Sequence, residues 1–511
     1  MSEALAIELK GISKYFGDVV ANKDISLSVK RGEILAILGE NGSGKTTLMN
    51  MVSGIYYPDE GQIFVNGREV IIRSPKDAFK YKIGMIHQHF KLVDVFTATE
   101  NIVLGVEEKK RFKIKEAEKR VKEITEKYGF SIDLKKKVYE MSVSEKQTVE
   151  IIKVLYRGAD ILILDEPTAV LTPQETQKLF AVLRKMKQDN KSIIIITHKL
   201  NEVLEISDRV TTLRKGKYAG AVNTADADEQ LLTEMMVGEK VDLNIHRELP
   251  VSPKERLEVQ DLCVMKDDGS FALENVAFKA YGGEILGVAG ISGCGQKELL
   301  ESIAGLQEAT KKSSVLYKPD ELGPQQLVGK TPEEIRKLGI ALSFVPEDRL
   351  GMGLVGDMDI IDNMMLRSYR DGRSVFLDRK GPKQLADRII DKLEVVTPGP
   401  TTPVRKLSGG NVQKVLVGRE IASNPKVLMV AYPVRGLDIN SSYTIYNLLN
   451  EQKKAGTAVI FVGEDLDVLL ELCDRIMVLN SGRVTGIVDA RTATKEEIGL
   501  LMTKSIMEEG A

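Results

Sequence analysis

A glycine-rich stretch, Gly39–Thr46, has the residue types and spacing needed to bind phosphate groups. It fits the phosphate-loop pattern G-x-x-x-x-G-K-[ST], in which glycines let backbone N–H groups turn inward around phosphate oxygens. Lys45 supplies a positive charge for the β- and γ-phosphates of a nucleoside triphosphate, and the Thr46 hydroxyl is a ligand for Mg²⁺. We therefore predict that the phosphates are held by Gly39, Asn41, Gly42, Ser43, Gly44, Lys45, Thr46 and Thr47.

The residues on either side of this loop support that interpretation. The apolar run Ile34–Leu38 predicts a buried parallel strand, and an apolar segment from Lys45 to Met49 predicts a helix. The alternative is a glycine-rich turn between strand and helix that binds nothing. The strand, loop and helix in this order favour phosphate binding, because the helix adds its positive N-terminal end to the same place.

Two carboxylates, Asp165 and Glu166, follow the apolar run Ile161–Leu164. Carboxylates at the end of a buried strand are costly unless they bind a cation or take part in acid–base chemistry. We predict that Asp165 helps to bind Mg²⁺ and that Glu166 polarises the attacking water. The alternative is a pair of solvated loop acids.

Polar residues at two further strand ends, and one aromatic residue, complete the predicted site. His198 follows the run Ile193–Ile196 and is placed to donate to the γ-phosphate, while Gln88 follows a strand-like segment and is placed to reach Mg²⁺. Phe16 or Tyr15 lies in an alternating segment near the start and offers a ring for stacking on adenine. A core aromatic is an equally good interpretation of that segment.

Composition excludes several classes of protein. The chain has 511 residues, enough for about two to four domains, with 43% hydrophobic residues and a net charge of −2, which gives no support for nucleic acid as the main partner. No apolar run approaches the ~18 residues of a membrane span, and the first residues do not resemble a signal peptide. We expect a cytoplasmic chain that does not cross a membrane. Its three cysteines show no metal-binding spacing and are interpreted as buried or incidental thiols.

The motifs occur twice, so the chain is a tandem repeat of one domain. Residues 239–256 lose periodicity and carry prolines and charges, as in a linker, after which the pattern restarts. Lys45 and Gln296 lie 251 residues apart, whereas Ser142/Ser408, Asp165/Ala431 and His198/Glu464 are each 266 residues apart. We predict a first domain over 1–240, a linker over 241–256 and a second domain over 257–511.

Together these motifs resemble those of the ATP-binding-cassette family, which also has a signature motif, here at 141–145 and 407–411. The resemblance implies an α/β fold in which each cassette has a mixed core sheet, an antiparallel β subdomain and a helical subdomain, with ATP and Mg²⁺ as cofactors. Two fused cassettes without a membrane segment resemble the ATPase subunit of bacterial simple-sugar and nucleoside importers. That class implies two integral-membrane permease subunits, a position on the cytoplasmic face of the membrane and, indirectly, an extracytoplasmic solute-binding lipoprotein. Residues 87–105 resemble the nucleoside branch, and a ribose- or galactose-type sugar importer is the alternative.

Departures from the family pattern predict that the two halves are not equivalent. The first signature, Met141–Glu145, lacks both glycines of the family motif, while the second, Leu407–Asn411, keeps them. In the second half Lys45, Thr46, Asp165, Glu166 and His198 are replaced by Gln296, Lys297, Ala431, Tyr432 and Glu464. Cassettes of this family pair head to tail, which implies that Ser408, Gly409 and Gly410 close over the γ-phosphate held by the first loop. One site should then hydrolyse ATP and the other should not.

Two readings from other classes stay open at this point. A soluble twin-cassette factor that acts on ribosomes or nucleic acid would also lack membrane spans, but it should carry a long basic linker and two intact sites. A scaffold that binds ATP without turnover would not need Glu166.

Overall fold

The computed structural model describes residues 4–17, 19–87, 90–106, 114–169, 171–240, 244–245, 247–250, 253–266, 268–291, 293–320, 323–337, 342–345, 349–369, 377–422, 425–435 and 437–503. The chain divides into two units, Met1–Asp242 and Leu243–Ala511. Each unit is described by itself.

The core of the first unit is a six-stranded mixed sheet in the order β10-β9-β3-β8-β7-β6. Its strands are β3 (Ile34–Leu38), β6 (Ile83–Ile86), β7 (Ile161–Asp165), β8 (Ser192–Ile196), β9 (Arg209–Arg214) and β10 (Lys217–Asn223). All neighbours pair in parallel except β9 and β10. β3, β7 and β8 are buried along their whole length, which explains their continuous apolar sequences, because both faces of such a sheet are covered. Their carboxyl ends meet at one edge of the sheet.

A second sheet of the first unit is antiparallel, in the order β2-β1-β4-β5. Its strands are β1 (Leu5–Phe16), β2 (Val19–Lys30), β4 (Glu60–Val65) and β5 (Arg68–Val70). Apolar side chains of this sheet pack in one cluster with α1 (Lys45–Val52) and one face of the core sheet. The helix that follows the phosphate loop is therefore held between two sheets.

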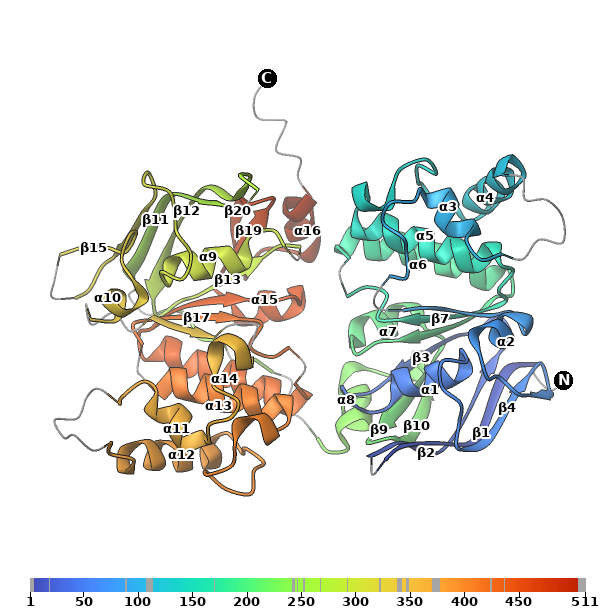
Figure 1. Cartoon of the computed structure of the whole chain (residues 1–511), viewed down its shortest axis with the longest axis horizontal. Coiled ribbons are helices and arrows are strands. Elements are labelled where there is room, and N and C mark those ends of the chain that lie inside the picture. Colours follow the sequence, from blue (N-terminus) through green and yellow to red (C-terminus); the bar gives the residue numbers. More distant parts are fainter. Residues whose placement is uncertain are drawn as a thin grey trace. The chain divides into compact units, whose positions relative to one another are not determined.

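The remaining helices of the first unit flank the core sheet or form a group of their own. α3 (Ala98–Val103), α4 (Ile114–Tyr128) and α5 (Val143–Tyr156) gather at the end of the unit away from β1, β2 and β4 (Figure 1). The sequence of α4 is rich in lysine and glutamate. The other helices are α2 (Pro75–Lys80), α6 (Pro173–Gln188), α7 (Leu200–Ile206) and α8 (Glu229–Val237).

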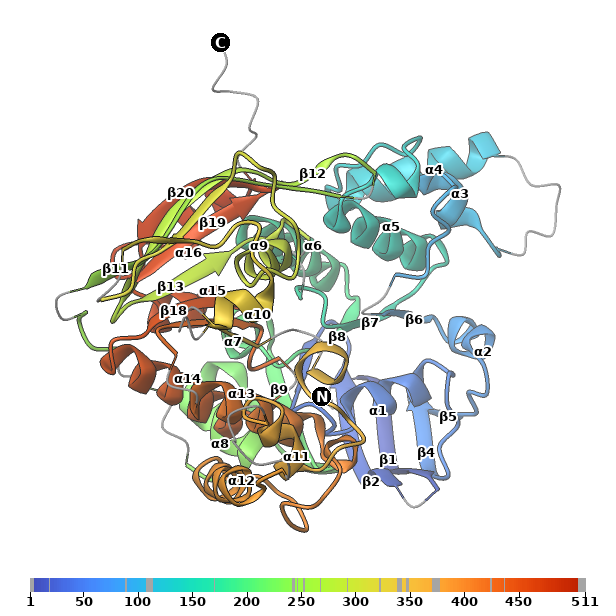
Figure 2. The same ribbon diagram turned by 60° about the vertical axis from the view of Figure 1, so that its left-hand side comes forward.

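The second unit repeats this arrangement. Its core sheet has the order β16-β17-β18-β13-β19-β20, and its antiparallel sheet has the order β12-β11-β14-β15. The strands are β11 (Lys254–Met265), β12 (Phe271–Gly282), β13 (Ile285–Ala289), β14 (Ser314–Tyr317), β15 (Gln325–Gln326), β16 (Leu342–Val345), β17 (Val427–Ala431), β18 (Ala458–Val462), β19 (Arg475–Asn480) and β20 (Arg483–Asp489). The helices are α9 (Gln296–Ile303), α10 (Pro332–Lys337), α11 (Ile360–Met365), α12 (Lys380–Lys392), α13 (Gly409–Ala422), α14 (Ile439–Lys454), α15 (Leu466–Leu472) and α16 (Lys495–Thr503). Figure 2 shows α11, α12 and α13 grouped away from β11 and β12. The predicted α/β class, with a mixed sheet, an antiparallel sheet and a helical group in each half, is confirmed.

Part of the segment predicted as a linker lies against the second unit. Arg247 Nη1 donates to the carbonyl oxygen of Leu470, 2.9 Å away, and to that of Cys473, while Lys453 Nζ donates to the carbonyl oxygen of Glu248 at 2.6 Å. Strand β11 begins at Lys254, inside the range 241–256. The chain is thus fastened to the second unit before its first strand begins.

Lys453, which contacts Glu248, also belongs to an ion pair that is more buried than the equivalent pair of the first unit. Lys453 and Asp474 lie 2.8 Å apart and each side chain is 4% exposed. The equivalent pair in the first unit, Lys187 and Asp208, is 38% and 39% exposed. The same pair is therefore a surface feature in one unit and a buried one in the other.

In the part of the chain that the structure describes, no helix has the length and apolar composition needed to cross a bilayer. Cys473 is buried, and Cys263 and Cys294 are partly buried, all three as free thiols. This agrees with the interpretation of the cysteines as buried or incidental.

Candidate nucleotide site

The phosphate loop of the first unit connects β3 to α1, as predicted. Gly44 caps α1 with a φ of +93°, and a Cβ at this position would lie 2.5 Å from the carbonyl oxygen of Ala21, so only glycine fits. The first N–H groups of α1 have no partner within the helix and, with the helix dipole, favour an anion there. The Ser43 hydroxyl is buried in the loop and has no hydrogen-bond partner among the described residues. These features fit a bound phosphate group.

Lys45 places its ammonium group back over the loop. Its Nζ donates to the carbonyl oxygens of Gly39 at 2.6 Å and Glu40 at 2.9 Å. Burial lowers the pKa of Lys45, and the negative charges of Glu166 and Asp165 act in the opposite direction. The loop therefore presents a buried positive charge next to two carboxylates.

Asp165, the last residue of β7, lies beside Thr46. Its Oδ1 accepts a hydrogen bond of 3.4 Å from Thr46 Oγ1. Burial raises the pKa of Asp165 and the neighbouring charge of Glu166 raises it further, while the Thr46 hydroxyl lowers it. A nearby cation would stabilise the ionised carboxylate, and hydroxyl and carboxylate oxygens are the ligands that Mg²⁺ prefers. These two residues fit a magnesium ion.

Glu166 is held in an unusual backbone conformation. Its φ is +46°, which is unfavourable for a residue other than glycine, and its N–H donates to the carbonyl oxygen of Ile196 at 2.8 Å. The hydrogen bond from His198 lowers the pKa of the Glu166 carboxyl despite its partial burial, with Lys45 and Lys199 contributing in the same direction. The carboxylate is therefore kept ionised, as a general base requires.

The structure brings five predicted residues together through direct contacts or charge interactions: Lys45, Thr46, Asp165, Glu166 and His198. Gln88 lies outside the described residues, so its predicted role stays a prediction.

Phe16 is not a core residue. It is 43% exposed, its ring packs edge-on against that of Tyr56 with centroids 5.2 Å apart, and Lys14 Nζ lies 5.5 Å from its ring centre. The interpretation of Phe16 as a core aromatic is wrong, while stacking on adenine stays a prediction. Tyr56 was missed at the sequence level, since nothing in a turn after a helix signals contact with a distant strand.

The corresponding loop of the second unit keeps the backbone shape without the charge. Gln296 is only 3% exposed, and its Nε2 lies 2.8 Å from where a Cβ on Gly290 would be, so the amide folds back over the loop as Lys45 does. Lys297, at the position of Thr46, is exposed and pairs with Glu301 at 3.8 Å. A neutral amide thus replaces the ammonium group, and no hydroxyl is available for a metal at this position.

The strand ends of the second unit also keep their backbone geometry. Tyr432 has a φ of +51° and its N–H donates to the carbonyl oxygen of Val462 at 2.9 Å, as Glu166 does to Ile196. Arg435 lies 3.8 Å from Glu464, and both side chains are 53% exposed. Ala431 and Tyr432 supply no carboxylate, so this strand end offers neither a metal ligand nor a general base.

The helices that follow the two signature motifs begin differently. In the first unit, Glu145 accepts a hydrogen bond of 2.7 Å from the N–H of Ser142 and pairs with Lys136 at 2.8 Å, so a carboxylate lies at the start of α5. In the second unit, Ser408 accepts from the Asn411 side chain at 2.9 Å, and the first turn of α13 contains no acid. A carboxylate therefore lies at the start of the first signature helix, and the first turn of the second signature helix contains none.

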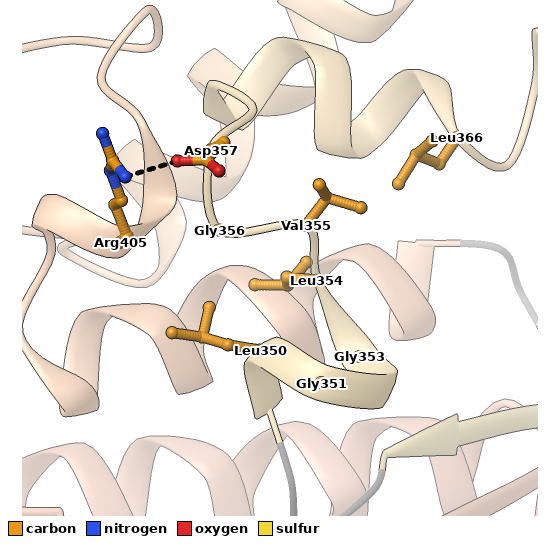
Figure 3. A pocket seen from close by; sticks show the side chains of 9 residues that line it. All are labelled: Leu350, Gly351, Gly353, Leu354, Val355, Gly356, Asp357, Leu366 and Arg405. Atoms are coloured by element: carbon orange, nitrogen blue, oxygen red, sulfur yellow. Dashed lines mark ion pairs between the residues drawn. The ribbon is translucent and has the colours of Figure 1, made fainter.

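A surface pocket of about 410 Å³ lies in the second unit. It is lined by the glycine-rich turn around Gly353 and Gly356, by Leu366 and by Arg405, which pairs with Asp357 at 2.6 Å (Figure 3). None of the predicted site residues lines it. It is not part of the candidate nucleotide site.

Comparisons with known proteins agree with this geometry. The family model described as "ABC transporter" matches residues 22–169 and 273–433. The nucleoside import ATP-binding protein NupA of Lactococcus lactis subsp. cremoris is 41% identical over 508 residues, covering 98% of this chain and 99% of that protein. The guanosine import ATP-binding protein NupO of Bacillus subtilis is 41% identical over 508 residues, 98% of each chain. The glucose import ATP-binding protein TsgD13 of Haloferax volcanii is 38% identical over 532 residues, covering 97% of this chain and 95% of that protein. This chain therefore belongs to the ABC transporter family, as an ATPase with two tandem cassettes.

Proposed function

We propose that this chain hydrolyses ATP at the site of its first unit to drive the import of nucleosides. The observation that carries this proposal is the arrangement of Lys45, Glu166 and His198 around the phosphate loop. Lys45 holds the β- and γ-phosphates, and His198 donates to the γ-phosphate. Glu166 orients the attacking water and takes its proton as the bond between the γ-phosphorus and the bridging oxygen breaks, giving ADP and phosphate.

Thr46, Asp165 and Gln88 are the proposed Mg²⁺ ligands, the first two because they lie together at the loop. When bound, the ion neutralises charge on the phosphate oxygens. Phe16 is proposed to stack on adenine, because its exposed ring leaves room for a base.

We propose further that the first loop works with the second signature, with Ser408, Gly409 and Gly410 closing over the γ-phosphate. Two differences within the units support this pairing. The intact loop lies in the first half and the signature with both glycines lies in the second, and Glu145 already places a carboxylate at the first signature helix. The second loop and the first signature would then form a site that does not hydrolyse ATP.

Nucleosides are favoured over sugars because two relatives at 41% identity are named for nucleoside and guanosine import, against 38% for the glucose importer. The proposed partners are two integral-membrane permease subunits, on whose cytoplasmic face the chain sits, and a solute-binding lipoprotein that acts through them. The proposed domains are a first cassette over 1–240, a linker over 241–256 and a second cassette over 257–511.

The test is ATP hydrolysis by the complex reconstituted with its permease pair in vesicles. Guanosine should stimulate hydrolysis and be taken up, and ribose or glucose should do neither. Stimulation by the sugars with no response to guanosine would assign the chain to sugar import. A Glu166→Gln complex serves as the control without turnover.

A further inference from the structure

Three side chains near the site form a cluster to which no role has yet been given. The Thr168 hydroxyl donates to Glu202 Oε2, while Lys199 Nζ lies 3.0 Å from Glu202 Oε1 and donates to the Thr168 carbonyl oxygen at 3.1 Å. We call Thr168, Lys199 and Glu202 the loop clamp. It joins the segment that follows β7 to the beginning of α7.

The loop clamp lies next to the two residues at the centre of the site. Thr168 is two residues after Glu166, and Lys199 directly follows His198. Thr168 is 1% exposed and both charged partners are partly buried, so these hydrogen bonds are charge-assisted and partly shielded from water. The clamp therefore connects the backbone of the two strand ends that must keep Glu166 and His198 at 2.9 Å.

Glu166 has a strained backbone conformation that contacts such as the loop clamp can hold in place. A residue other than glycine in the left-handed region returns to a more favourable conformation unless its surroundings hold it. The main-chain bond to Ile196 holds the N–H of Glu166, and the clamp holds the chain two residues later. The two contacts thus hold the chain at Glu166 and two residues after it.

The second unit shows how these segments are held where no general base is present. The residues equivalent to Thr168, Lys199 and Glu202 are Val434, Asp465 and Val468. Both valines pack against the apolar core of that unit. Apolar contacts therefore hold these segments in the second unit. The polar cluster occurs in the first unit, which carries the Glu166 carboxylate and the His198 imidazole.

We infer that Thr168, Lys199 and Glu202 are positioning residues for ATP hydrolysis, which hold the Glu166 carboxylate against His198. This rests on the proposed function, because it assumes turnover at the first site. None of the three needs to touch ATP, so their loss should affect the rate of hydrolysis and leave nucleotide affinity unchanged. A displacement of a base by about 1 Å can cost roughly 10²-fold in rate.

The test compares variants of the full chain in ATP hydrolysis and in binding of trinitrophenyl-ATP. Thr168→Val and Glu202→Val, which introduce the residues of the second unit, should each lower kcat by roughly 10- to 100-fold with KM and Kd within about twofold of wild type. Thr168→Ser restores the hydroxyl and should restore most of the rate. Glu205→Val is the matched control, since Glu205 lies on the same helix and pairs with Arg184 at 3.1 Å; it should keep the wild-type rate.

Hydrogen–deuterium exchange provides a readout that does not depend on activity. Thr168→Val should speed exchange in the peptide that contains Glu166 and in the peptide that contains His198 and Lys199. Exchange in the peptide that contains Tyr432 should not change. Unchanged kcat and unchanged exchange in Thr168→Val would overturn the inference, and so would a raised KM at constant kcat, which would mean direct ATP binding. If wild type fails to hydrolyse ATP, or Glu166→Gln hydrolyses it normally, the proposed function is wrong, and the exchange data still decide whether the clamp holds the loop.

Discussion

Glu166 Oε1 and His198 Nδ1 lie 2.9 Å apart, so a hydrogen bond joins the ends of β7 and β8 in the first unit. A carboxylate can only accept, which assigns the proton of this bond to Nδ1 and leaves Nε2 of the ring for another partner. The bond therefore fixes the direction of the two groups relative to each other. In the proposed function both groups act at the γ-phosphate.

The first prediction concerns Glu166→Gln. The amide keeps the size of the side chain and cannot accept a proton from water, so kcat should fall by at least roughly 10²-fold. Binding of ATP, measured by equilibrium dialysis, should be retained, because Lys45 and the loop are unchanged. Hydrolysis close to the wild-type rate would show that Glu166 is not the base.

The second prediction compares the two phosphate loops. Lys45→Ala removes a buried ammonium group that is proposed to hold the phosphates, and it should lower the ATPase rate by roughly 10²–10³-fold. Gln296→Ala, the matched change in the other loop, removes a neutral amide and should leave most of the activity. Steady-state assays of both purified variants are sufficient. Similar losses in the two would mean that both loops take part in turnover.

The third prediction compares the two signatures. Ser408→Arg places a bulky cation at the start of α13 and should block hydrolysis, although Ser408 is more than 360 residues from Lys45 in the sequence. Ser142→Arg should cost far less, since the loop that it faces in the proposed pairing lacks a lysine. Rates are compared at saturating ATP, with circular dichroism as a check on folding. An equal loss in both variants would rule out a single active site.

The fourth prediction concerns acid stability of the antiparallel sheet of the second unit. Hydrogen bonds from Lys318 and Lys279 lower the pKa of Glu258 to about 2, and those from Arg256 and Lys254 do the same for Asp320. Because the folded-state pKa values are depressed, this stabilisation is present above the unfolded values, 4.5 for Glu258 and 3.8 for Asp320, and is lost as the pH falls toward 2.

Urea midpoints measured from pH 5 to pH 3 test this. Lys318→Met should make the midpoint of its transition less dependent on pH, and Lys311→Met, a change of an exposed lysine on the same segment, should not. Asp320 is exposed and Glu258 lies partly exposed at the surface, so high salt should weaken the effect. If Lys318→Met leaves the dependence of the urea midpoint on pH unaltered, Lys318 is not the cause of that dependence.

The parts of the site that could be predicted are those in which local sequence determines geometry. The phosphate loop and the strand-end residues Asp165, Glu166 and His198 follow from a glycine pattern and from apolar runs that end in polar residues. Parallel strands then bring the ends together. The repeat itself revealed the second unit and the positions at which it differs.

Other parts depend on contacts between distant segments of common residue types. The bond between Thr168 and Glu202 spans 34 residues, and neither residue stands out in the sequence. Alternation in β1 did not tell whether Phe16 would be buried, because that depends on where the strand leaves the sheet. The contact of Arg247 with the end of α15 was equally hidden, since charged residues in an irregular segment are typical of linkers.

The left-handed turn at Tyr432 shows which part of this geometry belongs to the fold. Its φ of +51° is close to that of Glu166, yet Tyr432 has no carboxylate to act as a base or as a metal ligand. The turn therefore belongs to the fold, with its N–H bonded to the neighbouring strand in both units. At this strand end the second half differs from the first in its side chains and not in its backbone.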